Sequence, residues 1–223
     1  MRNGELHMIR VKFCGIRRTK DIEAVNRLQP DFAGFVFAKS KRQVTKGQAA
    51  ALKELLDPGI KTIAVLVNMP AEEAAALANS GIADMLQLHG DEDAAYIAKL
   101  RTLTRAKVIK AVRLRSANRA INAKLLAEAA QADYYLFDTF LPDNYGGTGK
   151  TFSLSLLNNL LIDKPFFLAG GLDEDNVAEI IGQVQKDATL LPFFYGVDVS
   201  GGIETGVVKD PIKMEAFMKA IRG

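Results

Sequence analysis

The chain has 223 residues, of which 48% are hydrophobic and 25% charged, with a net charge of +3. This length suits one α/β domain with a large core, because barrels of this class run to about 200–250 residues as single units. The small net charge, with basic residues spread along the chain, argues against nucleic acid as the main partner. It fits a local anionic ligand instead.

Cys14 is the only cysteine, so no disulfide can form within the chain, which suits a reducing cytoplasm. No apolar run approaches the roughly 20 residues that a membrane span needs. Residues 1–7 lack the apolar core of a signal peptide. We therefore expect a cytoplasmic protein with no membrane partner, in which residues 1–223 form a single domain and residues 1–7 an N-terminal arm.

Short apolar runs alternate with longer segments of helical periodicity along the whole chain. Nearly continuous apolar runs are typical of parallel strands covered on both faces. The predicted strands are 9–13, 32–37, 61–67, 84–88, 107–112, 133–137, 165–169 and 194–198. The predicted helices are 19–28, 46–56, 71–79, 91–103, 118–131, 152–160, 174–185 and 211–221. Asp91 and Asp173 are placed to cap the helices that they begin or precede.

This strict alternation allows two architectures, an open doubly wound sheet or a closed (β/α)₈ barrel. An open nucleotide-binding sheet would normally show a G-x-G-x-x-G motif after the first strand, whereas Gly15 stands without one. The number of units in a chain of this length therefore predicts a single (β/α)₈ TIM barrel of the α/β class.

Polar residues gather where the predicted strands end, which is where a barrel of this class carries its active site. They are Cys14, Arg42, Gln87, His89, Asp138, Gly170, Gly171, Asp198 and Ser200. Each alone has a plainer interpretation: a free thiol is more often a small core residue, and a basic side chain more often a solvated charge. Their common place at the strand ends favours a site.

Glycine-rich stretches follow the last three predicted strands, at 146–150, 169–172 and 200–203. Glycine lets backbone N–H groups approach an anion closely, and barrels bind phosphate around strands seven and eight. We predict a phosphate site there rather than ordinary turns. Residues 144–151 are similar to a Walker A loop, but Asn144 occupies its first glycine position, which argues against an NTPase.

Seven motifs occur in register along the chain. They are KFCG at 12–15, GFVF at 34–37 with SKR at 40–42, QLHG at 87–90, FDT at 137–139, GGTGKTF at 146–152, AGGL at 169–172 and VDVS at 197–200. With these motifs the chain resembles the phosphoribosylanthranilate isomerase family of tryptophan biosynthesis, across residues 8–221.

The resemblance implies an Amadori rearrangement, in which N-(5-phosphoribosyl)anthranilate becomes the corresponding 1-deoxyribulose 5-phosphate. It implies no cofactor and no metal. The furanose ring opens and a proton leaves ribose C2, so the reaction needs an acid near the ring oxygen and a base near C2. The resemblance assigns the acid to Asp138 and the base to Cys14.

The resemblance also assigns binding roles. Arg42 would hold the anthranilate carboxylate, and His89 and Asp198 would orient ribose hydroxyls. The phosphate would lie on backbone N–H groups of Gly149, Gly170, Gly171, Ser200 and Gly201. Gly201 stands where the family usually has a second serine, which removes a hydroxyl and keeps the N–H donor.

Both catalytic roles make chemical demands. Aspartic acid has an ordinary pKa of about 3.9, so Asp138 must hold its proton when substrate is bound, and cysteine, at about 8.5, is mostly thiol near neutrality. A nearby cation would raise the thiolate fraction. We expect the Lys12 side chain to alternate away from that of Cys14, so the sequence names no cation beside the thiol.

Other functions remain open at this point. Indole-glycerol-phosphate synthase would carry a catalytic lysine and glutamate at strand ends, and a ribulose-phosphate epimerase a metal cluster; neither set is apparent. The alternative from a different class is a non-catalytic sugar-phosphate-binding barrel. Such a barrel would keep the glycine loops but would not need Cys14 or Asp138, so the presence of both residues argues against it. The expected partner is a small sugar phosphate, and the expected assembly a monomer or a homodimer.

Overall fold

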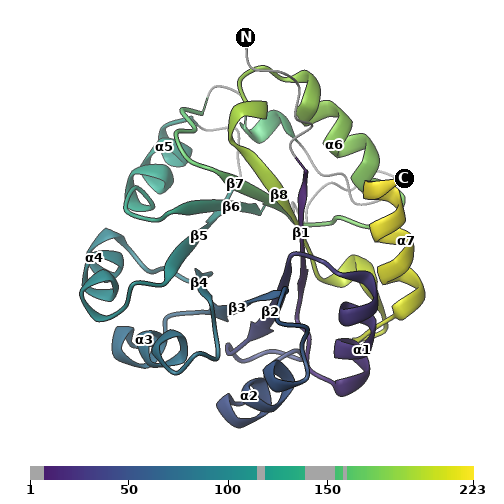
Figure 1. Ribbon diagram of the computed structural model, residues 1–223. Helices are drawn as coiled ribbons and strands as arrows, with labels where there is room; N and C mark the ends of the chain where they lie inside the picture. The colour runs from purple at the N-terminus through teal and green to yellow at the C-terminus, as the bar shows by residue number, and fades with distance from the viewer. Residues whose placement is uncertain (1–7, 115–118, 139–153, 158–159) are drawn as a thin grey trace.

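Eight parallel strands form a closed barrel in chain order, with the last strand pairing back onto the first (Figure 1). The computed structural model describes residues 8–114, 119–138, 154–157 and 160–223. The strands are β1 (Arg10–Cys14), β2 (Phe32–Val36), β3 (Lys61–Leu66), β4 (Met85–Leu88), β5 (Lys107–Arg113), β6 (Tyr134–Asp138), β7 (Phe166–Ala169) and β8 (Phe194–Val199). The predicted (β/α)₈ TIM barrel is confirmed, and each predicted strand limit lies within about one residue of the observed one.

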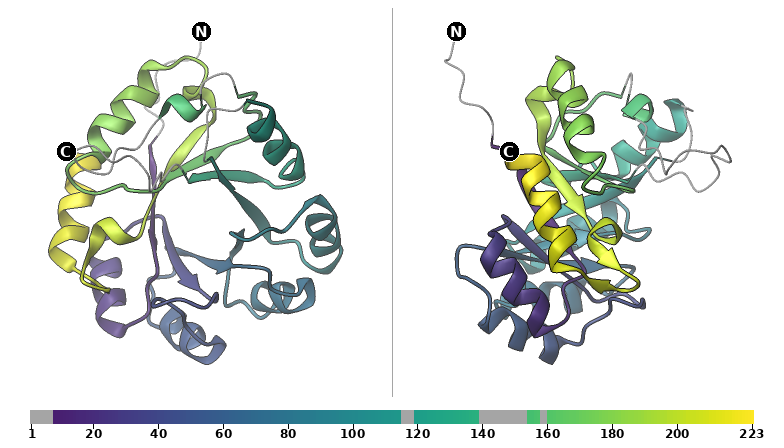
Figure 2. Two further views of the ribbon diagram at one scale, coloured as in Figure 1. Left: turned by 180° about the vertical axis from the view of Figure 1, so that it is seen from behind. Right: turned by 90° about the vertical axis from the view of Figure 1, so that its right-hand side faces the viewer.

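Helices surround the barrel on its outside, as the two views of Figure 2 show. They are α1 (Thr19–Leu28), α2 (Lys46–Glu54), α3 (Ala71–Asn79), α4 (Ala94–Leu103), α5 (Arg119–Glu128), α6 (Val177–Lys186) and α7 (Pro211–Arg222). Where we predicted a helix over 152–160, the described residues form only the 3₁₀ helix η1 (Leu154–Leu157). Residues 152, 153, 158 and 159 lie outside the described part of the chain.

Short elements follow the last two strands. The 3₁₀ helix η2 (Leu191–Phe193) precedes β8, and η3 (Gly201–Ile203) follows it. A small antiparallel hairpin of β9 (Glu204–Thr205) and β10 (Val208–Lys209) comes next and was not predicted, because two-residue strands leave no alternating pattern to detect.

The predicted helix caps were wrong in detail. Asp93, not Asp91, caps α4: its side chain accepts the Tyr96 N–H at 2.8 Å, because the helix begins at Ala94, three residues later than predicted. Asp173 accepts the N–H groups of Asp175 and Asn176 at 3.2 and 3.1 Å. It therefore stabilises the turn before α6 rather than the first turn of the helix itself.

The barrel interior is apolar at the amino ends of the strands. Buried side chains from the six consecutive strands β2 to β7 fill it, namely Phe32, Ile63, Met85, Ile109, Leu136 and Phe167. The rings of Phe32 and Phe167 meet edge to face at 5.7 Å. Burial of side chains this size stabilises the fold by about 1.5–3 kcal/mol each. This layer forms the floor on which the polar residues at the carboxyl ends rest.

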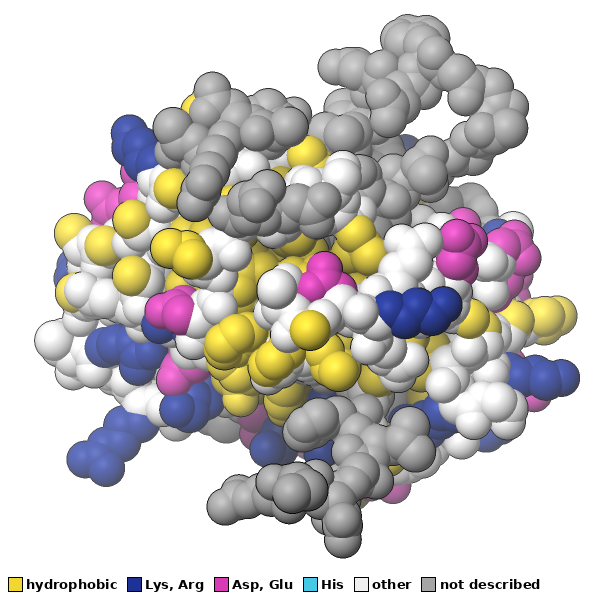
Figure 3. All heavy atoms as spheres, turned by 90° about the horizontal axis from the view of Figure 1, so that it is seen from above, with side chains coloured by type: hydrophobic (Ala, Val, Ile, Leu, Met, Phe, Trp, Pro, Cys, Tyr) yellow, Lys and Arg dark blue, Asp and Glu magenta, His cyan; other side chains and the backbone are white. Residues whose placement is uncertain are grey.

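The surface seen in Figure 3 mixes Lys and Arg with Asp and Glu side chains, in keeping with the small net charge. No helix in the described part of the chain is long and apolar enough to cross a membrane.

Candidate active site

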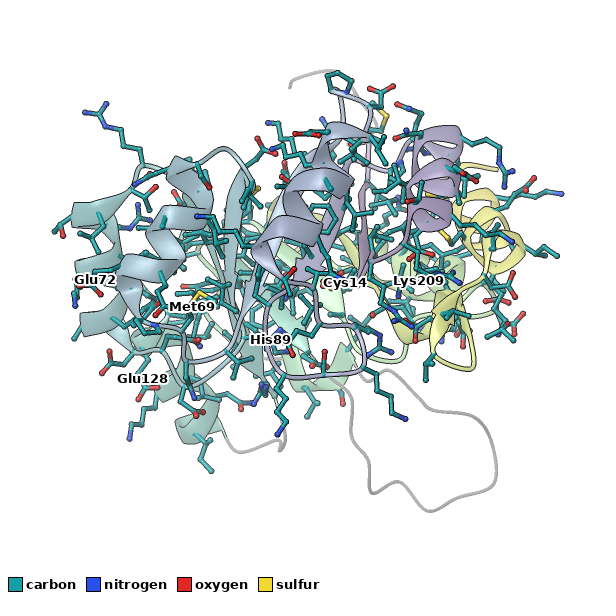
Figure 4. All side chains as sticks on the ribbon, turned by 90° about the horizontal axis from the view of Figure 1, so that it is seen from below. Cys14, Met69, Glu72, His89, Glu128 and Lys209 are labelled. Carbon is teal, nitrogen blue, oxygen red and sulfur yellow. The ribbon has the colours of Figure 1, made fainter. Side chains whose placement is uncertain are left out.

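A cavity of about 760 Å³ lies at the carboxyl ends of the strands. It brings together every predicted site residue that the structure describes: Cys14, Arg42, His89, Asp138, Gly170, Gly171, Asp198, Ser200 and Gly201. Gly149 lies outside the described residues. Figure 4 shows Cys14 and His89 near the middle of the view, whereas Glu72 and Glu128 lie at its outer edge.

Cys14 is the last residue of β1, and its side chain faces the cavity while the residue is only 8% exposed. The Ser200 hydroxyl donates to its carbonyl at 3.0 Å, which ties the end of β1 to the turn after β8. Burial raises the pKa of the Cys14 thiol above its ordinary value, and the Lys12 ammonium opposes that rise. The thiol is therefore predominantly protonated at neutral pH.

The expectation that Lys12 points away from Cys14 was wrong. Residues two apart on a strand share a face, so both side chains point into the barrel. Their common neighbour is Gly34: a Cβ atom there would lie 3.0 Å from Lys12 Cε and 3.2 Å from Cys14 Sγ. The absence of a side chain at Gly34 gives the lysine room beside the thiol.

Lys12 is fully buried and held by two acceptors. Its Nζ donates to Asp198 Oδ2 at 2.9 Å and to Gln87 Oε1 at 2.7 Å. Burial disfavours its charge, but the Asp198 carboxylate and the Cys14 sulfur outweigh burial and raise the pKa of Lys12. Among the described residues, the buried Oδ1 of Asp198 has no hydrogen-bond partner. An unpaired buried carboxylate oxygen at a cavity wall is suited to accept a ligand hydroxyl.

His89, the residue after β4, and Asp138, the last residue of β6, lie close together in the cavity wall. His89 Nε2 lies 3.6 Å from Asp138 Oδ2, beyond ordinary hydrogen-bond length. Gln87 Nε2 lies 2.9 Å from the other ring nitrogen, His89 Nδ1. Hydrogen bonds thus run from Lys12, beside Cys14, through Gln87 to His89, and Asp138 lies 3.6 Å beyond the ring.

Arg42 reaches the cavity from the loop after β2 and pairs with Glu204. Its Nε and Nη2 atoms donate to the two carboxylate oxygens at 2.7 and 2.6 Å. The buried Lys209 adds a third hydrogen bond to Glu204, at 2.7 Å, and contacts the Ser200 carbonyl at 2.8 Å. Although burial opposes ionisation, these hydrogen bonds lower the pKa of Glu204. Glu204 and Lys209 were missed because only the β9–β10 hairpin brings them together.

The glycine turns after β7 and β8 pack against each other. Gly170 and Gly171 have φ angles of +93° and +67°, which favour glycine. A Cβ atom on Gly202 would lie 1.9 Å from the Leu172 carbonyl oxygen, so only glycine permits this approach. Gly201 and Gly202 are the first two residues of η3, and the first N–H groups of a helix have no partner within it.

The closed barrel and the cavity together define the class: a (β/α)₈ barrel whose candidate active site lies at the carboxyl ends of its strands. A family model described as N-(5'phosphoribosyl)anthranilate (PRA) isomerase matches residues 11–220. The chain therefore belongs to the phosphoribosylanthranilate isomerase family.

Individual relatives agree with this family. The N-(5'-phosphoribosyl)anthranilate isomerase of Thermoanaerobacter sp. (strain X514) is 44% identical, over 97% of this chain and 99% of its own length. The solved phosphoribosylanthranilate isomerase of Thermotoga maritima is 31% identical, with a TM-score of 0.79 over 96% of this chain and 99% of that one. A further isomerase structure, in complex with reduced 1-(o-carboxyphenylamino)-1-deoxyribulose 5-phosphate, is 28% identical, with a TM-score of 0.77 over 96% and 99%.

Proposed function

We propose that this chain converts N-(5'-phosphoribosyl)anthranilate into 1-(o-carboxyphenylamino)-1-deoxyribulose 5-phosphate, a step of tryptophan biosynthesis. One observation carries the proposal: a thiol and a carboxylate, Cys14 and Asp138, line the same cavity as two glycine turns in a chain of this family. The reaction is an internal redox isomerisation, so no electrons leave the substrate and the expected chemistry requires only proton transfers.

Asp138 is assigned the acid role. It gives its proton to the ribose ring oxygen as the C1–oxygen bond breaks, and the nitrogen lone pair forms an iminium at C1. Cys14, as thiolate, then takes the proton from C2, and the C–H electrons form the C1–C2 double bond of an enolamine. Proton transfer from the C2 hydroxyl to C1 yields the ketone, so that substrate and product remain isomers. Cys14 then releases its proton to solvent and Asp138 takes one up, which restores both groups for the next turnover.

The thiolate is the demanding part of this scheme, because burial raises the pKa of Cys14. Two features reduce the demand. The iminium acidifies the C2 proton, and the ammonium of Lys12 beside the sulfur favours the charged form. A thiol that ionises only in part can therefore act once the ring is open.

The remaining cavity residues are assigned to binding. The Nε and Nη2 atoms of Arg42 donate to the Glu204 carboxylate. Its Nη1 donors would bind the carboxylate of the anthranilate ring. The unpaired Oδ1 of Asp198 would accept a ribose hydroxyl, whereas the two ring nitrogens of His89 face protein groups, Gln87 and Asp138. The phosphate would lie on the turns at Gly170, Gly171, Ser200 and Gly201, with Gly149 from the segment after β6.

Turnover of freshly generated phosphoribosylanthranilate, followed by the loss of its fluorescence, tests the activity. Cys14→Ala and Asp138→Asn should each lower kcat by at least about 100-fold, the usual contribution of an acid or base. Both should still bind the reduced product analogue. Arg42→Ala should instead raise KM, because it removes a substrate contact distant from the bonds that change.

Wild-type turnover no faster than the spontaneous reaction would refute the enzyme assignment. If the protein then still bound the product analogue, the non-catalytic sugar-phosphate-binding barrel would be the better function. Normal turnover in Cys14→Ala or Asp138→Asn would refute that residue's role only.

We further propose that the protein works in the cytoplasm as a monomer or a homodimer. The single cysteine and the biosynthetic family support the location. A related structure from Thermotoga maritima, 27% identical with a TM-score of 0.74, is described as mutually generated monomers of a dimeric isomerase. Light scattering on the purified chain distinguishes the two.

A further inference from the structure

Gln87 lies under the site, in contact with two of its residues and with no catalytic role assigned. It is 1% exposed on β4 and lies between Lys12 of β1 and His89. Lys12 Nζ is 2.7 Å from its Oε1, and its Nε2 is 2.9 Å from His89 Nδ1. The opposite nitrogen of the same ring, Nε2, is 3.6 Å from Asp138 Oδ2.

The orientation of the Gln87 amide follows from its neighbour on β1. An ammonium has donors only, so the atom of Gln87 that faces Lys12 must be the carbonyl oxygen. The amide nitrogen then faces His89, and it too has donors only. His89 Nδ1 must therefore accept, which leaves the proton of the neutral ring on Nε2. The tautomer is thus fixed by a buried lysine on another strand.

We propose that Gln87 is a positioning residue: locked by Lys12, it holds His89 in the tautomer that presents an N–H to Asp138. This rests on the proposed function, in which Asp138 becomes a carboxylate when it gives its proton to the ring oxygen. An N–H aimed at that carboxylate stabilises it as the charge forms. His89 keeps its own proton throughout, so the proton count of the reaction is unchanged.

Hydrogen bonds on both sides fix the backbone from which the His89 ring projects. The backbone of His89 is anchored at both polar groups, because its N–H donates to the Leu66 carbonyl at 2.8 Å and its carbonyl accepts from Arg113. The opposite tautomer would place two donors against each other between Gln87 and His89. Leaving a buried donor unpaired is unfavourable, so the tautomer with its proton on Nε2 is preferred.

The tautomer can be read directly, because the chain has only two histidines, His7 and His89. In a His7→Gln background, the ring ¹⁵N spectrum at about pH 8, where an ordinary histidine is neutral, reports His89 alone. The expected spectrum shows Nε2 protonated and Nδ1 unprotonated. Gln87→Glu keeps an acceptor for Lys12 but offers His89 an oxygen, so the proton should move to Nδ1. Gln87→Met should give a mixture of tautomers.

Kinetics test whether the tautomer matters. Gln87→Glu and Gln87→Met should lower kcat roughly tenfold to a hundredfold, the scale of losing an orienting contact, with KM nearly unchanged. In a His89→Ala background, Gln87→Met should cost much less than it does alone, because its effect passes through the ring. Thermal melting checks that each variant is folded.

Several outcomes would overturn the proposal: a wild-type ring protonated on Nδ1, an unaltered tautomer in Gln87→Glu, or additive kcat losses in the double variant. A wild-type protein without turnover that still shows the Nε2–H tautomer would refute the proposed function. It would leave the assignment of the Gln87 amide intact, so the two failures are distinguishable.

Discussion

Lys12 is a buried cation whose three N–H donors are nearly all accounted for. Gln87 and Asp198 accept two of them, and the Cys14 sulfur is the neighbour that the third can serve. In the protein without substrate the main ion pair of the Lys12 ammonium is with the Asp198 carboxylate. A thiolate formed during turnover finds the same cation already in place, so no reorganisation is needed when the charge appears.

The pH dependence of Cys14 alkylation checks this arrangement, and the single cysteine makes the readout unambiguous. The wild-type rate should rise with pH along a curve centred above the ordinary thiol pKa of about 8.5, since burial raises the pKa of Cys14. Lys12→Met removes the cation that opposes this rise, so the curve should move to still higher pH. Each unit of displacement lowers the rate at neutral pH about tenfold.

Lys99→Met is the matched control, because Lys99 is exposed and pairs only with Glu72 among the described residues. Its alkylation curve should coincide with that of the wild type. A Lys12→Met curve that stayed in place or moved to lower pH would contradict the role given to Lys12.

At the scale of elements, the strands were predictable and the short connections were not. Apolar runs of four or more residues mark the strands, and the polar residues that end them, Cys14 and Asp138, follow from barrel topology. The β9–β10 hairpin has two residues per strand, too few for any periodicity. Glu204 and Lys209 lie opposite each other in that hairpin. Their spacing in the sequence therefore does not predict the ion pair between them or the one between Glu204 and Arg42.

The error over Lys12 has a different origin. The sequence does contain the signal, because residues 12 and 14 of one strand must share a face. Burying the charge of a lysine without a partner costs so much free energy that such a residue is easily assigned to the outside of a barrel. Its partner, Asp198, is 186 residues away along the chain, and only the closed barrel shows that the cost is met.

The contact between the turns after β7 and β8 gives a prediction at this scale. Gly202→Ala places a Cβ within 1.9 Å of the Leu172 carbonyl, so the two turns must separate. Binding of the reduced product analogue should weaken at least tenfold while the barrel strands remain folded. Affinity by calorimetry and secondary structure by circular dichroism measure the two effects.

Gly182→Ala provides the comparison. Gly182 lies inside α6, and a Cβ there would meet nothing within 4 Å. Alanine should stabilise the helix by about 0.5–1 kcal/mol and leave ligand affinity unchanged. Equal affinity in both variants would show that the close approach of the turns is unimportant for binding.

At the scale of the whole molecule, ligand binding should stabilise the barrel, because the cavity is lined from β1, β4, β6, β7 and β8 together. At a product analogue concentration 100 times its Kd, the free energy of unfolding should rise by about 2.7 kcal/mol. Thermal melts over a concentration series measure this rise. A melting temperature independent of ligand concentration would show that the analogue does not bind the folded barrel.

The pairing of β1 with β8 has a consequence for how the protein is made. Lys12 and Asp198 are in register across this seam, and Phe217 of α7 packs on Phe13 of β1 with ring centroids 6.3 Å apart. A chain emerging from the ribosome therefore contains Cys14 and Lys12 early, yet cannot bury the lysine until nearly all of the chain is present. The ammonium of Lys12 stays solvated until β8 pairs with β1. The same pairing closes the barrel and completes the proposed active site.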